Sequence, residues 1–398
     1  MVKEALKIKI DQIAERIHSE VIHDRRHLHS NPELSFYEFE TRDYIASRLK
    51  EMGIEFQRMA DTGLVTVIKG DLPSNKVVAL RADIDALPIT EANDVSYKSK
   101  NARIMHACGH DAHTSSLLGT AKILLELKKE FGGTVKLIFQ PAEEKYPGGA
   151  SKMIQEGVLE NPKPAAVIGQ HVMPELEAGK VGFRAGKYMA SNDELYVTVR
   201  GKGGHGAQPD QNIDPVVIAA HIIIALQEIV SRMANPNCPS VLSFGKVVAN
   251  GVVNVIPDEV NLEGTFRTVD QAWRKKAHTH MRKIAEGMAK CMNASCSFKI
   301  IKGYPVLTNE ERLTKDLQKF STEYLGKERV IDLDMTMAAE DFAYYSQVSD
   351  SCFYRLGTGN KKAGITSSLH TPTFNIDENS LRISSGLMAY LALRQLGN

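Results

Sequence analysis

Strand-like and helix-like segments alternate along the first 170 residues, and this alternation limits the folds open to the chain. Short runs of apolar or β-branched residues are separated by segments with helical spacing; the runs lie at 64–69, 76–80, 134–139 and 165–168. Alternation of this kind implies a largely parallel sheet covered by helices on both faces. We therefore predict an α/β fold for this part of the chain.

A second pattern begins near Ser191. The expected elements follow the order strand, helix, strand, strand, helix, strand; they lie at 194–200, 214–233, 240–248, 259–268, 271–292 and 297–301. The order βαββαβ is the signature of a ferredoxin-like domain with an antiparallel sheet. We expect such a domain at 191–303, inserted between the two parts of the α/β domain at 1–190 and 304–398.

Composition and charge limit the partners and the location that we expect for the protein. The 398 residues are 43% hydrophobic, and 49 Lys and Arg against 48 Asp and Glu leave a formal charge of +1, so neither nucleic acid nor an anionic membrane is implied as a partner. We see no apolar run approaching the ~20 residues that span a bilayer. The first eleven residues do not resemble a signal peptide, so we expect a cytoplasmic protein.

The run from His106 to His113 reads His-Ala-Cys-Gly-His-Asp-Ala-His. In an extended segment His106, Cys108 and His110 would leave the same face, and thiolate with imidazole favours zinc or a similar divalent ion. The chain has five scattered cysteines, an odd number, which argues against a disulfide framework and leaves Cys108 free. The alternative is a buried cysteine beside solvated histidines. Asp111 can cap a helix from about residue 112.

Polar clusters follow the predicted strands of the larger domain, where ligands collect in open α/β sheets. They are Arg81–Asp85, Gln140–Glu144, Gln170–His171 and, after a strand at 351–356, Leu369–Pro372. Of the adjacent pair Glu143 and Glu144, one can bind a metal while the other stays free as a general base; a solvated loop is the alternative. His171 and His370 are either ligands or hydrogen-bonded histidines. Asp83 is either a cap or the acceptor for a ring N–H of a ligating histidine.

Eight segments that span nearly the whole chain carry recognisable motifs: 25–29, 32–34, 81–88, 105–113, 140–144, 203–207, 340–342 and 369–372. Taken together and in this order, these motifs resemble those of peptidase family M20, the dinuclear aminoacylase and carboxypeptidase metallopeptidases. The resemblance is closest to its amidohydrolase subgroup of hippurate hydrolases, N-acyl-amino-acid aminoacylases, N-acetyldiaminopimelate deacetylases and auxin-conjugate hydrolases.

The resemblance implies two divalent ions per subunit, zinc or manganese, with cobalt or nickel as further options. Their ligands would be Cys108, between the metals, with His110, Glu144, His171 and His370. It also implies that Glu143 activates a metal-bridging water to hydrolyse the amide bond of a small N-acyl amino acid or conjugate. His106 and His113 would then have supporting roles. The two metal ions together with their ligands would carry a net positive charge.

The inserted domain would act as a lid and dimerisation surface in a homodimer or higher homo-oligomer. The resemblance implies that His205, in a glycine-rich loop, stabilises the oxyanion in a partner subunit; a simple turn is the alternative. Asn254 and Arg267 are candidates for holding a substrate carboxylate, because Arg offers a bidentate fork and Gly251 allows close approach near Asn254. Arg267 can equally be a solvated strand residue.

Two other functions fit the same motifs. One is a dipeptidase or aminopeptidase of the same family, although we find no clear site for a free α-amine. The other is a metal-binding protein that keeps the fold without the chemistry. The adjacent Glu143 and Glu144 speak against the second, because loss of the base would be expected there.

Overall fold

The computed structural model describes residues 2–397, which form two compact units. The first unit contains the residues up to Gly186 together with Thr308–Asp334 and the residues from Asp341 onward; the second contains Lys187–Leu307 and Met335–Glu340. The junctions lie within about four residues of those expected from the sequence, at 190/191 and 303/304. The return of 335–340 to the second unit has no counterpart in the sequence pattern.

A mixed sheet, mostly parallel at its centre, runs through the first unit. Within the described residues its strand order is β1-β2-β4-β3-β5-β16-β6-β15. The strands are β1 (Phe56–Met59), β2 (Gly63–Lys69), β3 (Leu72–Asp83), β4 (Gly132–Gln140), β5 (Ala166–Glu177), β6 (Val181–Phe183), β15 (Val330–Asp332) and β16 (Ser351–Gly359). The neighbours β4-β3-β5-β16 are parallel, as predicted, whereas β1, β2 and β6 join antiparallel partners.

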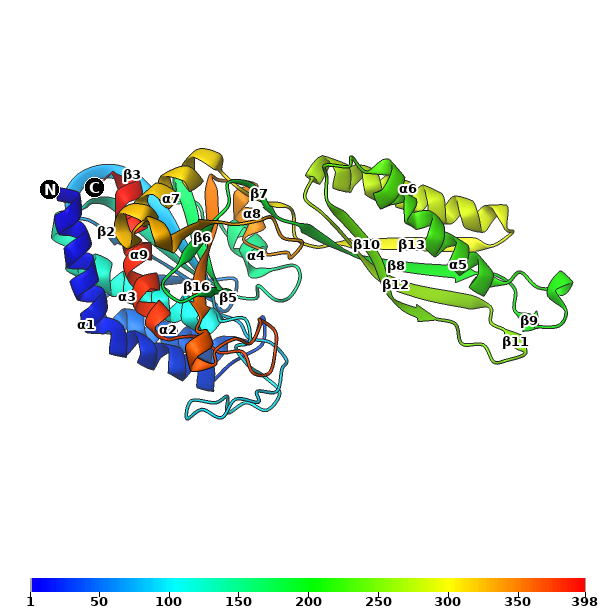
Figure 1. Ribbon diagram of the computed structural model, residues 1–398, viewed down its shortest axis with the longest axis horizontal. Helices are drawn as coiled ribbons and strands as arrows, with labels where there is room; N and C mark the ends of the chain where they lie inside the picture. The colour runs from blue at the N-terminus through cyan, green and yellow to red at the C-terminus, as the bar shows by residue number, and fades with distance from the viewer. Residues whose placement is uncertain (1, 398) are drawn as a thin grey trace. The chain divides into compact units, whose positions relative to one another are not determined.

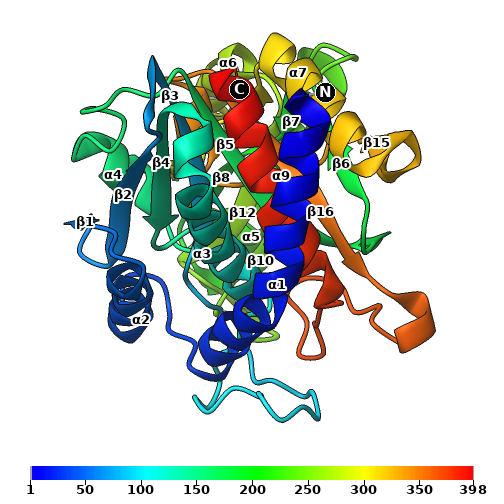
Figure 2. The same ribbon diagram turned by 90° about the vertical axis from the view of Figure 1, so that its left-hand side faces the viewer.

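Helices lie on both sides of this sheet. They are α1 (Val2–Ser30), α2 (Phe39–Glu51), α3 (His110–Glu126), α4 (Gly149–Gln155), α7 (Glu311–Leu325), α8 (Ala343–Ser346) and α9 (Asn379–Leu396), with 3-10 turns η1 (Lys128–Glu130), η4 (Lys327–Arg329) and η5 (Lys361–Ala363). Helices α1, α3 and α9 pack together on one face, and Figure 2 shows them in front of the sheet. Figure 1 shows α4 and α8 on the other side.

Burial on both faces explains the apolar runs of the central strands. All but one of the residues of β4 are buried, and α3 is buried almost all round because it lies between the sheet, α1 and α9. One apolar cluster unites these elements; its fully buried members include Leu80, Leu117, Leu137, Ile168 and Leu391. This rigid layer places the ends of β3 and β4 at one edge of the sheet, where the polar clusters begin.

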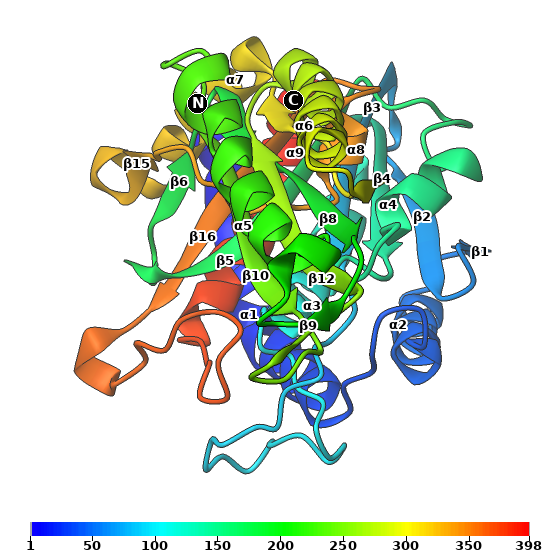
Figure 3. The ribbon, with the colours of Figure 1, turned by 90° about the vertical axis from the view of Figure 1, so that its right-hand side faces the viewer.

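The second unit has the predicted βαββαβ order. Its four-stranded antiparallel sheet has the order β10-β12-β8-β13, and Figure 3 shows α5 and α6 across one face of it. Its elements are β8 (Ser191–Arg200), β9 (Gly204–His205), η2 (Pro209–Gln211), α5 (Pro215–Leu226), the π-helical turn η3 (Ile229–Met233), β10 (Ser240–Val248), β11 (Val255–Ile256), β12 (Glu259–Thr268), α6 (Gln271–Cys291) and β13 (Ser295–Lys302). Strands β7 (Gly186–Met189) and β14 (Leu307–Asn309) lie at the chain junctions.

One expectation about membranes is wrong. The segment Pro215–Met233, 19 residues with a mean hydropathy of 1.7, is long and apolar enough to cross a bilayer by length and composition. Core helices of water-soluble proteins meet the same criterion, so this is weak evidence for a span. In the structure the inner face of α5, including Ile218 and Ile222, packs in the apolar cluster of the second unit.

Candidate metal centre

Five potential ligands converge from separate elements of the first unit. Cys108 lies in the loop before α3, His110 is the first residue of α3, and Glu144 follows β4. His171 lies within β5 rather than after it, because that strand continues to Glu177. His370 lies in a turn after β16 with a φ of +60°, a left-handed conformation that is uncommon for residues other than glycine.

The ligand atoms form two groups that share one thiol. The Sγ atom of Cys108 lies 3.3 Å from His171 Nε2 and 3.3 Å from His370 Nε2, and His370 Nε2 lies 3.2 Å from Glu144 Oε1. Donor atoms of Cys108, His110 and His171 lie within 4.8 Å of one another, and so do those of Cys108, Glu144 and His370. Each group suits one divalent ion, with Cys108 between the two positions.

The hydrogen-bonding state of these side chains fits a cation. The Nδ1 atom of His110 lies 2.9 Å from the carbonyl oxygen of Asp85, and that of His171 lies 2.7 Å from the carbonyl oxygen of Val172. Each Nδ1 therefore donates, which leaves Nε2 as the ring nitrogen that can bind a metal ion. Within the described residues, the buried His110 Nε2 has no hydrogen-bond partner. A buried polar atom of this kind needs a partner, and a metal ion supplies one.

The cluster carries excess negative charge. Burial raises the pKa of the Cys108 thiol, and the carboxylates of Glu144 and Glu143 raise it further. Burial alone would lower the pKa of His110, but Asp83 and Asp85 outweigh that effect and raise it to about 10. A divalent cation bound to His110 would replace a proton of its ring. The same cation would favour the thiolate form of Cys108.

Asp85, rather than Asp83, orients a predicted ligand histidine. The Asp85 carboxylate lies 3.1 Å from His110 Nδ1 and accepts the backbone N–H of Glu144 at 3.0 Å, so it joins two ligand positions. Asp83 instead lies 2.5 Å from Nδ1 of His113. The expectation that Asp83 receives the ring N–H of a ligand is therefore wrong. The two aspartates stand two residues apart, and sequence spacing does not decide between them.

His113 uses both ring nitrogens within the protein. Its Nε2 accepts the backbone N–H of Val172 at 2.9 Å, so its Nδ1 donates to Asp83. Burial would raise the pKa of Asp83, but the charges of Arg81 and of the adjacent histidines hold it well below its usual range. His113 thus links the end of β3 to β5, beside the predicted ligand His171, with ring centroids 4.7 Å apart.

The run from His106 to Asp111 does not have the extended geometry expected from its sequence. Gly109 has a φ of +81° and α3 begins at the next residue, so His110 faces a different direction from His106. His106 is buried with neither ring nitrogen hydrogen-bonded among the described residues, and burial lowers its pKa to about 4. Asp111 does not cap α3; its carboxylate binds Arg25 and His29 of α1, each at 2.8 Å.

Glu143 lies beside the ligand cluster and is 7% exposed. One of its carboxylate oxygens lies within 4.8 Å of donor atoms of His110 and Glu144. Its Oε1 accepts the backbone N–H of Asp341 at a long 3.4 Å. The preceding residue, Ala142, has a φ of +50°, a left-handed conformation that is uncommon for residues other than glycine.

A buried network beneath the cluster was not indicated by the sequence. The Asp341 carboxylate accepts hydrogen bonds from Arg81 Nη2 and Gln140 Nε2, both at 2.8 Å, and from the backbone N–H of Ala150 at 3.0 Å. Arg81 also binds Gln140 and Asp83. This network ties β3, β4 and α4 to the residue that contacts Glu143. Its partners are up to 260 positions apart, so no local pattern reveals them.

The three predicted residues of the second unit fall at two places. His205 and Asn254 lie together: β9 pairs with β11, Val255 stands opposite His205, and Gly206 N–H donates to the Asn254 carbonyl at 2.9 Å. Arg267 lies near the far end of β12, where its guanidinium donates to the carbonyl of Met337 at 2.9 Å. From residue 259 to 267 the strand extends ~26 Å. Within one chain, Asn254 and Arg267 therefore lie too far apart to hold the same carboxylate.

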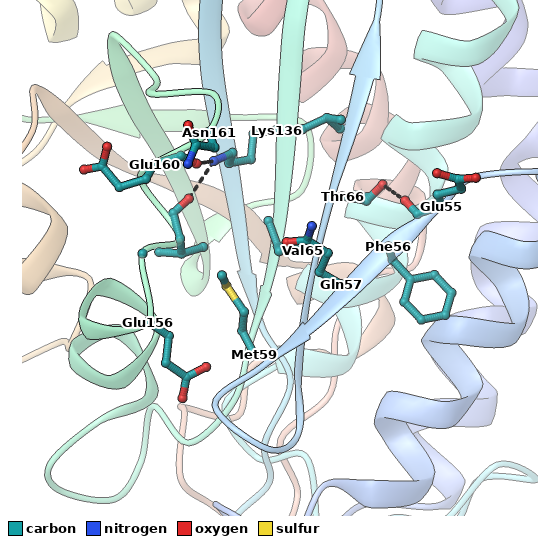
Figure 4. A pocket seen from close by; sticks show the side chains of 13 residues that line it. Glu55, Phe56, Gln57, Met59, Val65, Thr66, Lys136, Glu156, Glu160 and Asn161 are labelled. Atoms are coloured by element: carbon teal, nitrogen blue, oxygen red, sulfur yellow. Dashed lines mark hydrogen bonds between the residues drawn. The ribbon is translucent and has the colours of Figure 1, made fainter.

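A surface hollow of about 510 Å³ lies elsewhere on the first unit (Figure 4). It is bordered by β1 and β2, with Phe56, Met59 and Val65 among its lining residues. Lys136 is held there by the carbonyl oxygens of Val158 and Glu160, at 2.7 and 2.6 Å. None of the predicted ligands lines this hollow, so it does not contain the candidate centre.

Comparison with known proteins agrees with the resemblance in the motifs. The sequence matches Peptidase family M20/M25/M40 over residues 79–394. It is 43% identical to an N-acyl-L-amino acid amidohydrolase of Geobacillus stearothermophilus over 78% of this chain and 83% of the relative. It is 36% identical to thermostable carboxypeptidase 2 of Saccharolobus solfataricus over 97% of this chain and 98% of the relative.

A solved structure shares the fold. The Bacillus subtilis YXEP protein, described as a dinuclear metal binding peptidase from the M20 family, aligns with a TM-score of 0.83 and 36% identity. The alignment covers 96% of this chain and 99% of that protein. The similarity extends through both units of the chain.

Proposed function

Because the chain belongs to Peptidase family M20/M25/M40, we propose that it is a dinuclear metal-dependent amidohydrolase that releases an amino acid from a small N-acyl amino acid or conjugate. The observation that carries this proposal is the pair of three-ligand groups that share Cys108, with Glu143 beside them. A similar relative is named for N-acyl-amino-acid hydrolysis. We assign the two ions to Cys108, His110, Glu144, His171 and His370.

Bound divalent ions would acidify water toward a pKa of ~7 and polarise an amide carbonyl. Glu143 performs the proton transfers. Its carboxylate takes a proton from the attacking water as the new C–O bond forms, and then delivers that proton to the amide nitrogen as the C–N bond breaks. The products are a carboxylic acid and a free amino acid. The thiol and the imidazoles favour zinc, the Glu144 carboxylate also suits manganese, and cobalt or nickel would satisfy the same ligands.

A panel of substrates tests the activity and separates it from the second candidate, a peptidase of the same family. The similarity to a carboxypeptidase keeps that candidate in view. The purified protein, loaded with Zn²⁺ or Mn²⁺, should hydrolyse N-acetyl and N-benzoyl amino acids and bind two ions per chain. Faster cleavage of dipeptides than of every acyl derivative would favour the peptidase. Two bound ions without hydrolysis of either class would indicate a metal-binding protein.

The second unit provides a surface for a homodimer, in which it would also act as a lid. Strand β10 is at the edge of its sheet, and α5 exposes Val216, Val217 and Ile224, the last at 70%. An apolar face beside a free edge strand suits a second copy of the chain. The substitution Val217→Glu should shift the protein toward monomer in light scattering. Val67→Glu, at a similarly exposed valine of the first unit, is the matched control.

His205 and Asn254 lie at the end of the second unit opposite Arg267, which supports a role for the first two in the site of a partner subunit. His205 is exposed, and its Nδ1 accepts the backbone N–H of Ala207, so its Nε2 can donate to an oxyanion. A mixture of His205→Ala and Glu143→Gln chains should regain about a quarter of wild-type activity, because half of the dimers contain one intact site. A mixture as inactive as its parents would contradict sharing.

A cytoplasmic location is part of the same proposal. All five cysteines are unpaired, including the buried Cys108 and Cys352, which suits a reducing compartment. The near-neutral charge gives no reason to expect a nucleic-acid or membrane partner. Fractionation of the native cells would test the location.

A further inference from the structure

A buried carboxyl group outside the metal cluster reaches the turn that carries Glu143 and Glu144. Glu38, which immediately precedes α2, is fully buried. Its Oε1 accepts the backbone N–H of Ala142 at 2.8 Å, and its Oε2 accepts the hydroxyl of Thr62 at 2.7 Å. One side chain therefore ties the end of β4 to the loop between β1 and β2.

The turn at Ala142, which Glu38 contacts, has an unfavourable backbone conformation. Ala142 has a φ of +50°, a left-handed conformation that is unfavourable for a residue with a Cβ atom. Its carbonyl accepts the N–H of Gly149 at 3.0 Å, and a Cβ atom on Gly149 would lie only 1.8 Å from the Pro141 carbonyl oxygen. Both polar backbone groups of Ala142 are thus held, so its peptide planes set where the next two side chains point.

We propose that Glu38 is a positioning residue that holds Ala142 in the left-handed conformation and thereby aims Glu143 and Glu144 at the metal cluster. The inference rests on the proposed function for the roles of these two glutamates. Glu38 touches neither of them in the described contacts, and it acts through the backbone of Ala142.

The two hydrogen bonds of the Glu38 side chain do not depend on its charge. Burial and the neighbouring carboxylate of Asp85 raise the pKa of Glu38 to about 7. The ionised form accepts both hydrogen bonds, and the protonated form accepts from Ala142 while it donates to the Thr62 hydroxyl. A glutamine does the same with its carbonyl oxygen and its amide group. An alanine makes neither bond and leaves the N–H of Ala142 without its acceptor.

Glu33 provides a matched control from the same segment. Its carboxylate accepts the backbone N–H and the hydroxyl of Thr41 at 2.7 and 2.8 Å, in the first turn of α2. Glu33 therefore also accepts a hydrogen bond from a backbone N–H, but that N–H is not adjacent to Glu143 and Glu144. Loss of Glu33 should lower stability without changing the direction of Glu143.

The experiment compares Glu38→Ala, Glu38→Gln and Glu33→Ala with the wild type as Zn²⁺-loaded proteins. We expect Glu38→Ala to lose about tenfold or more in kcat, with a smaller change in KM, and to bind Zn²⁺ more weakly in competition with a chelator. Glu38→Gln should recover kcat and Zn²⁺ affinity to within about threefold. Glu33→Ala should lower the Tm but keep both quantities near wild type.

Two results would overturn the proposal: a kcat for Glu38→Ala equal to that of Glu33→Ala, or a Glu38→Gln variant as impaired as Glu38→Ala. Should the alanine variant not fold, Glu38→Asp, one methylene shorter, takes its place with the same criteria. Failure of the proposed function is distinguishable, because wild-type protein would then not hydrolyse N-acyl amino acids, whereas Zn²⁺ affinity would still report on the turn.

Discussion

The substitution Asp85→Asn tests how the cluster is held together. The buried Asp85 carboxylate accepts hydrogen bonds from three groups: Oδ1 from the His110 ring, and Oδ2 from the Glu144 backbone N–H and the Ser35 hydroxyl. A carboxamide has only one acceptor oxygen, so its amide group must face either the His110 ring N–H or the Glu144 N–H. Facing Glu144, the amide group leaves a backbone N–H without its acceptor, which costs about 1–3 kcal/mol; facing His110, it sets two donors against each other and leaves the ring N–H only the Asp85 backbone carbonyl at 2.9 Å.

That loss falls on residues that present two proposed ligands, so it should appear in metal binding. We expect Zn²⁺ affinity to fall about 10- to 100-fold in competition with a fluorescent chelator, as 1.4 kcal/mol corresponds to tenfold. Asp193→Asn is the control, since Asp193 is an equally buried aspartate of the second unit that binds Arg274 and His278. A Zn²⁺ affinity of Asp85→Asn within twofold of wild type would refute the reasoning.

Three further predictions concern charge, packing and ligands. The bonds from His278 and Arg274 outweigh the effect of burial and lower the pKa of Asp193. Its contribution to stability is therefore present above the unfolded pKa of about 3.9 and is lost at lower pH, so the Tm difference between wild type and Asp193→Asn should shrink from pH 6 to pH 3. Gly149→Ala should lower both Tm and activity because its Cβ would meet the Pro141 carbonyl oxygen; the control Gly287→Ala, in open space on α6, should raise stability by about 0.5–1 kcal/mol. Cys108→Ser should bind fewer than two metal ions in elemental analysis, whereas Cys352→Ser should keep both.

The architecture was largely predictable because burial leaves a periodic trace in sequence. Central strands such as β4 are buried along almost their whole length and contain an apolar run, and the six elements of the second unit follow the predicted order. Element ends were harder to predict. β5 runs nine residues beyond the predicted end at 168, since an apolar run does not show where pairing stops. Helix α3 begins at His110, directly after Gly109, rather than at about residue 112 as predicted.

The candidate site was predictable only in part. The five proposed ligands do come together, although only Glu144 closely follows a strand end; Cys108 and His110 lie at the start of α3, and His171 lies within β5. The groups that orient them come from tertiary packing: Asp85 rather than Asp83 meets His110, and Asp341 meets Arg81 across 260 positions. Spacing along the chain carries no information about such pairs.

The most direct test of the central claim is a paired measurement on Glu143→Gln. Glu143 is proposed to move protons, while the ions are assigned to other side chains. Elemental analysis should therefore find two metal ions per chain, as in the wild type, while kcat for an N-acetyl amino acid falls about 10²- to 10⁴-fold. Two bound ions with a kcat near that of the wild type would contradict the account.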